Sequence, residues 1–72
     1  MFALIGYGGE QAGIRPRTRL ACILNTKIQT WNGHGWVNCS LKVEEVTIYK
    51  TWTRHPEETE VRRAKKRLSP IP

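Results

Sequence analysis

The composition of the chain changes sharply near residue 54, and this change restricts the fold more than any other feature. Residues 1–54 are rich in β-branched and aromatic side chains and carry glycine-marked turns, whereas residues 55–72 consist largely of Glu, Arg, Lys, Ala and Pro. The first composition favours strands and the second favours a helix. We therefore predict a β-rich domain at residues 1–54, followed by a C-terminal basic helix and tail at residues 55–72.

Five short runs in the first part have the character of strands. They lie at residues 2–7, 18–24, 27–31, 36–43 and 46–53. In the fourth run, apolar and polar side chains alternate as far as Val43, which predicts one apolar and one polar face. Because 72 residues allow only one small domain with a marginal core, we predict a β-rich α+β fold. Its β part is either a five-stranded small antiparallel sheet or an SH3-like or OB-like barrel, and a basic C-terminal helix follows.

The segments between these runs carry turn and loop residues. Asn25-Thr26 predicts a turn between the second and third strands, and "NGHG" at residues 32–35 predicts a hairpin between the third and fourth. The segment "EQAGIRPR", residues 10–17, predicts a loop because Gly13 and Pro16 interrupt it.

The tail has the signature of an amphipathic helix. Pro56 suits the first helical position, and His55 is a candidate cap. Glutamates come early in the segment and the cations come late, which is the polarity that the helix dipole favours. Ser69-Pro70 predicts its end. The apolar residues at helical spacing, which predict a narrow stripe able to dock on the sheet, are Val61, Ala64 and Leu68.

Positive charge is in excess throughout the chain. Twelve Lys and Arg residues stand against six Glu and no Asp, a net charge of +6, which favours polyanionic partners such as nucleic acid. The densest run is "RRAKKR", and its cations are candidate phosphate contacts: Arg62, Arg63, Lys65, Lys66 and Arg67. The alternative is a solvated helix face balanced by its acidic first turn, with Glu58 and Arg62 as an i,i+4 ion pair.

A second basic cluster precedes the second strand. Arg15, Arg17 and Arg19 alternate along the chain, so in extended geometry their guanidinium groups project to one side. Such a stripe can pair with phosphate or carboxylate groups. The alternative is a charged strand edge that guards against aggregation.

Two tryptophans flank the predicted hairpin turn. Trp31 and Trp36 either form a structural cross-strand pair or expose aromatic faces on which unpaired bases stack. Trp52 and Tyr49 on the fifth strand could extend either a core or such a platform.

Catalytic and metal-binding signals are weak. Cys22, His34, Cys39 and His55 are the residue types of a zinc site, but they lack any close pair such as Cys-x-x-Cys. The chain has no Asp, and its Cys and His residues carry no sign of an activated nucleophile. We predict no metal site, no cofactor and no enzymatic activity.

The location and partners follow from the same features. No run approaches the ~20 apolar residues of a membrane span, and "MFALIG" lacks the features of a signal peptide. We expect a cytoplasmic protein that does not bind membranes.

We find no motif that assigns the chain to a family. The leading hypothesis is a small basic protein that binds DNA or RNA, mainly through its phosphates. The alternative is a protein-binding accessory or inhibitor factor of phage or plasmid type that docks on an acidic partner, and exposed strand edges would also permit homo-oligomers.

Overall fold

The computed structural model describes residues 1–7 and 17–68 of the chain. Its elements are β1 (Phe2–Tyr7), β2 (Arg17–Leu24), β3 (Lys27–Trp31), β4 (Trp36–Asn38), the 3-10 helix η2 (Val43–Glu45), β5 (Thr47–Trp52) and α1 (Glu58–Arg67). The predicted loop at residues 10–17 lies outside the described residues, except for Arg17, which begins β2. The predicted stop at Ser69-Pro70 lies outside them as well.

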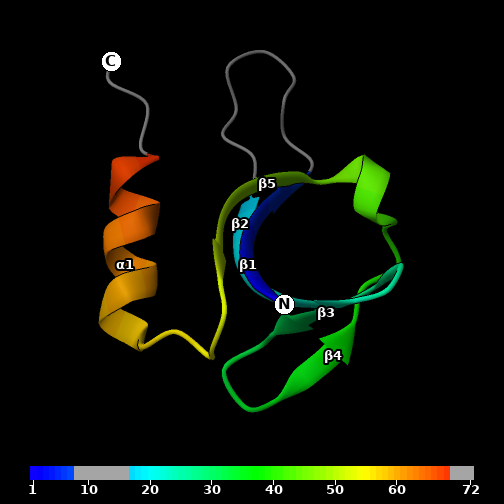
Figure 1. The fold of residues 1–72 in the computed structure, drawn as a ribbon, viewed down its shortest axis with the longest axis horizontal. Coiled ribbons are helices and arrows are strands. Elements are labelled where there is room, and N and C mark those ends of the chain that lie inside the picture. Colours follow the sequence, from blue (N-terminus) through cyan, green and yellow to red (C-terminus); the bar gives the residue numbers. More distant parts are fainter. Residues whose placement is uncertain (8–16, 69–72) are drawn as a thin grey trace.

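The strands form one antiparallel sheet in the order β4-β3-β2-β1-β5. Within the described ranges β4 and β5 stand at opposite edges and do not pair, so the sheet is open and the barrel is not closed. The antiparallel sheet with one C-terminal helix, and hence the β-rich α+β class, is confirmed. Figure 1 shows the sheet curling around its inner face, with α1 on the outside of the curve.

Local turn chemistry explains the first hairpin. Leu24 pairs with Lys27, so Asn25 and Thr26 alone connect β2 to β3, as predicted. Asn25 has φ 57°, in the left-handed region that asparagine tolerates better than most residues.

The prediction that the fourth strand extends to Val43 is wrong. β4 ends at Asn38, and Val43 begins η2. The reason is the length of its neighbour: Asn38 pairs with Gln29, and the amide of Cys39 still donates to the carbonyl of Ile28, 2.9 Å away. β3 begins only one residue before Ile28, so the chain beyond this point has no strand to pair with. Alternation of apolar residues persists past that limit because Cys39 and Val43 pack against the inner core without being in a strand.

The inner face of the sheet carries the main core. Its buried members are Ala3, Ile5, Ala21, Ile23 and Ile28, and Cys39, Val43 and Val46 pack against them. The segment that contains η2 therefore covers this face. Leu4 pairs with Leu20 on the opposite, outer face, and both are buried.

The helix α1 covers the outer face only thinly. Ala64 is its buried residue, and Val61 and Leu68 are half-buried, as the predicted apolar stripe requires. None of the helices within residues 1–7 and 17–68 has the length and apolarity to cross a membrane.

The predicted helix start is wrong by two residues. Pro56 precedes the N-cap Glu57, whose backbone is extended at φ −73° and ψ 154°, and no side chain caps the helix, so His55 is not a cap. Pro56 is buried and stands directly before the N-cap. This is the first position of a hydrophobic staple, in which an apolar residue packs toward the residue five places on, here Val61. Burial of its ring accounts for its place before the helix.

A close contact joins the central strand to the edge strand β5. The register between β1 and β5 shifts next to Ile5, so Tyr49 is an additional residue that bulges from the edge. Its ring lies over Gly6, where a Cβ would come within 2.5 Å of the Tyr49 Cε2 atom. The absence of a side chain at residue 6 therefore makes room for the tyrosine.

This contact predicts a coupling between the two residues. Gly6→Ala displaces the ring and lowers the free energy of unfolding by about 1–3 kcal/mol. In a Tyr49→Ala background the same change is neutral or stabilising, because alanine suits a strand better than glycine. Urea unfolding of the four proteins of this double-mutant cycle measures the coupling, and equal costs in both backgrounds contradict it.

Candidate nucleic-acid interface

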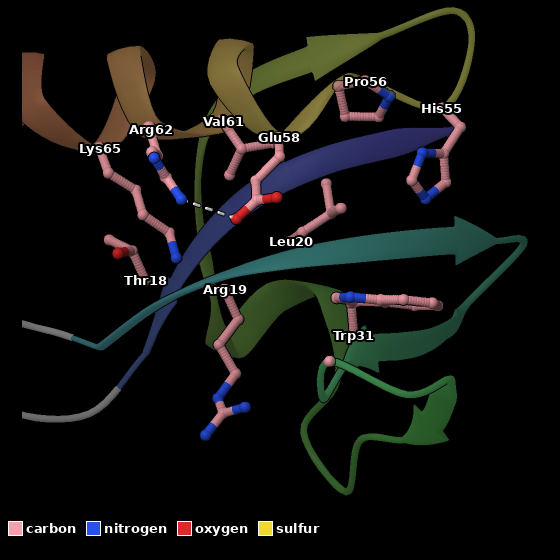
Figure 2. A pocket seen from close by; sticks show the side chains of 11 residues that line it. Thr18, Arg19, Leu20, Trp31, His55, Pro56, Glu58, Val61, Arg62 and Lys65 are labelled. Carbon is pink, nitrogen blue, oxygen red and sulfur yellow. Dashed lines mark hydrogen bonds and ion pairs between the residues drawn. The ribbon is translucent and has the colours of Figure 1, made fainter.

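A cleft of about 870 Å³ lies between α1 and the outer face of the sheet. Its lining residues are Thr18, Arg19, Leu20, Trp31, Gly33, His55, Pro56, Glu58, Val61, Arg62 and Lys65. They come from three places: β2, the β3–β4 hairpin, and the connection from β5 into α1 (Figure 2). The cleft exists because α1 meets the sheet along only a narrow stripe.

The helix supplies the charged wall of the cleft. Glu58, Arg62 and Lys65 follow one another at helical spacings of four and three residues, so they share one side of α1. The Arg62 Nη2 atom donates to the Glu58 Oε1 atom at 3.0 Å, the dashed contact in Figure 2. The two side chains are 75% and 82% exposed, so this pair contributes at most about 1 kcal/mol and opens readily.

The other helix cations lie outside the cleft. Arg63, Lys66 and Arg67 are exposed and are not among its lining residues. Across residues 17–68, no described carboxylate forms an ion pair with these three or with Lys65. The candidate phosphate contacts on α1 are thus divided between the cleft wall and the solvent-facing side of the helix.

The arginine cluster before β2 is only partly described. Arg15 lies outside the described residues, and for Arg17 only its backbone in β2 is known. Arg19 pairs with Ile5, whose side chain belongs to the inner core, and Figure 2 shows its guanidinium pointing away from α1. Arg19 thus lines the same cleft as Arg62 and Lys65, but its guanidinium group points away from these helix cations.

Trp31 and Trp36 face one another directly across the hairpin. They form a register pair with ring centroids 5.3 Å apart at an interplanar angle of 65°, and both are half-buried. This geometry is that of a structural cross-strand pair. Trp31 alone of the two also lines the cleft, so the pair has one member that a ligand can reach there.

The hairpin tip is held by one side chain. The Asn32 Oδ1 atom accepts hydrogen bonds from the amides of His34 at 2.8 Å and Gly35 at 2.9 Å, and Gly33 adopts φ 96°. His34 itself is exposed. The Asn-Gly sequence thus fixes both the reversal of the chain and the position of the two tryptophans.

His55 and Phe2 belong to the aromatic cluster, although sequence patterns did not single them out for this role. The His55 ring lies 5.2 Å from Phe2, 6.1 Å from Trp31 and 5.9 Å from Trp36, in edge-to-face geometry. The Phe2 ring is also 5.7 Å from Trp36. No local signal relates residues this far apart in the chain; His55 reaches the cluster from the connection between β5 and α1.

Tyr49 and Trp52 do not extend this cluster into the cleft. Tyr49 packs on Gly6, and Trp52 lies beneath Lys50, whose Nζ atom is 5.6 Å from the ring centroid. Neither residue lines the cleft.

The cysteine and histidine residues are dispersed. Cys22 pairs with Phe2 on the outer face, whereas Cys39 packs against the inner core, and both are free thiols. In the part of the chain that the structure describes, no group of three or more His, Cys, Asp or Glu side chains is arranged to hold a metal ion.

Comparison of the chain with family models, with curated proteins and with solved structures found no match.

The hydrogen bonds of Asn32 predict a measurable contribution to stability. Asn32→Ala removes the acceptor of two turn amides and lowers the free energy of unfolding by about 1–2 kcal/mol. Asn32→Asp keeps an acceptor oxygen at the same place and serves as the matched control. Chemical unfolding followed by tryptophan fluorescence compares the variants, and an alanine variant as stable as the aspartate variant would contradict this role.

Proposed function

We propose that this protein binds nucleic acid, DNA or RNA, and that the cations of α1 contact its phosphates. The proposal is supported chiefly by one observation: Arg63, Lys65, Lys66 and Arg67 are exposed and have no ion-pair partner among the described residues. Existing ion pairs would have to be broken before binding, whereas an unpaired cation can neutralise a phosphate directly and so release the counterions condensed on the nucleic acid.

The distribution of charge along α1 supports a position for the anion on this helix. Glu58 and Glu60 occupy the first turn, and Lys65, Lys66 and Arg67 occupy the last. Glu60 accepts a hydrogen bond from Arg54 at 2.9 Å, and Glu58 accepts one from Arg62, so the acidic turn is itself partly neutralised. We therefore expect a phosphate chain on the C-terminal half of the helix, while Arg19, whose guanidinium points away from α1, contributes only long-range attraction.

Matched charge removal tests this proposal. The variant Arg63→Gln, Lys65→Gln, Lys66→Gln is compared with Lys27→Gln, Lys42→Gln, Lys50→Gln, which removes the same net charge from exposed positions outside α1. Titration with labelled single-stranded and double-stranded DNA and RNA at several salt concentrations should show weaker binding for the helix variant. The logarithm of the binding constant decreases with the logarithm of the salt concentration. The size of this negative slope should be smaller by about 1 for each phosphate-binding cation that the substitutions remove. No binding by the unaltered protein at low salt contradicts the proposal, as does equal weakening in the two variants.

The open edges of the sheet support a second candidate function, an accessory factor that docks on another protein by strand addition. Ile48 on β5 and Val37 on β4 are 39% and 42% exposed, so each edge strand presents an apolar side chain that an added strand could cover. If β5 is the docking edge, Ile48→Lys removes a partner captured from nuclease-treated lysate, while Val37→Lys on the opposite edge retains it. Loss of every partner on nuclease treatment contradicts this candidate.

A further inference from the structure

The two ends of the cleft differ in chemistry. Figure 2 shows Trp31 and His55 at one end and Lys65 with Thr18 at the other, with Leu20 and Val61 between them. One end thus presents aromatic rings and the other an ammonium group. Leu20 and Val61 offer apolar contact between the two ends.

Trp31 has no parallel stacking partner among its aromatic neighbours in the described part of the chain. Its two nearest aromatic neighbours meet it at steep angles, 65° for Trp36 and 80° for His55, so neither is stacked parallel to the indole. Figure 2 shows the indole edge-on at the side of the cleft opposite α1. A flat ring entering the cleft can therefore lie against the indole without displacing a parallel partner.

The size and charge of the cleft restrict the occupant. Its volume of about 870 Å³ lies in the range of small-molecule sites, so it accommodates a base with its sugar but not a helix or a duplex. The wall carries Arg62 and Lys65 against Glu58, a surplus of positive charge that complements a phosphate. An apolar peptide side chain would match the aromatic end alone.

We infer that the cleft binds single-stranded nucleic acid by receiving one unpaired base on Trp31, beside His55, while Lys65 contacts a phosphate of the same strand. This inference rests on the proposed function and specifies its ligand. In a duplex both faces of each base are covered by neighbouring bases, so a ring inside a cleft cannot reach them. Stacking on aromatic side chains tolerates any base, so the site discriminates single strands from duplexes more than one sequence from another.

A comparison of three ligands tests this with the unaltered protein. The ligands are oligothymidylate, an abasic strand with the same number of phosphates, and a duplex of the same length. Oligothymidylate should bind about 5- to 150-fold more tightly than the abasic strand, which is the factor that one stacked base supplies. Tryptophan fluorescence should be quenched by oligothymidylate and not by the abasic strand.

A matched pair of variants locates the contact. Trp31→Leu and Trp36→Leu each remove one member of the same cross-strand pair, but only Trp31 lines the cleft. Trp31→Leu should remove the preference for oligothymidylate over the abasic strand and leave the salt dependence unchanged, whereas Trp36→Leu should retain the preference. Urea unfolding shows whether both variants fold; if Trp31→Leu does not, Trp31→Phe should show a reduced preference.

The outcomes separate this inference from the proposed function. Equal, salt-dependent binding of all three ligands overturns the base-stacking inference and leaves phosphate binding by α1 in place. Loss of the preference in Trp36→Leu and not in Trp31→Leu also overturns it. If no ligand binds at low salt, the proposed function fails and the inference fails with it.

Discussion

Burial of two adjacent side chains on the central strand is the constraint on which the rest of the structure depends. Leu4 and Ile5 are both fully buried, and because neighbouring residues of a strand point to opposite faces, they anchor two different layers. Ile5 belongs to the inner core under the η2 segment, and Leu4 pairs with Leu20 beneath α1. Each burial contributes about 1.5–3 kcal/mol, a large share of the stability of so small a domain. The outer face of the sheet, which forms one side of the candidate site, is therefore held in place by buried core residues.

The helix α1 covers the outer face of the sheet with few apolar side chains, and this limits the stability of the domain and leaves room for the candidate site. If α1 buried more than Ala64 and the stripe beside it, apolar side chains would fill the space between helix and sheet, and no cleft would remain. Pro56 and the ion pair of Arg54 with Glu60 hold the beginning of the helix, so its position does not require a wide apolar face. The concave surface thus goes with a small buried core on this side of the sheet, and if the cleft binds a ligand as proposed, binding and stability would compete here.

Features that depend on a few neighbouring residues were predictable from the sequence, and features set by distant partners were not. β1 and β3, the Asn25-Thr26 turn and the Asn-Gly hairpin follow from local patterns and have the predicted bounds. The end of β4 was mispredicted because it depends on the length of β3. The helix start was mispredicted because it depends on the burial of Pro56, which comes from tertiary packing. The place of His55 beside Phe2 and both tryptophans has no local signature, and neither does the cleft, because each requires three separated segments to meet.

The arrangement of charge explains why aromatic contact carries weight in the proposed binding mode. The sequence hypothesis required the +6 charge to gather on the helix and one flanking strand, but Arg19 points away from α1, and Arg54 and Arg62 are paired with glutamates. Only a few cations remain near one another on the helix, and each phosphate contact at the surface is weakened by salt. Stacking on a ring is less sensitive to salt than a phosphate contact, so the proposed binding mode would combine few charges with a ring to hold a strand at physiological ionic strength. In the proposed binding mode the cross-strand tryptophan pair would serve both purposes: Trp36 would support the hairpin, and Trp31 would face the ligand.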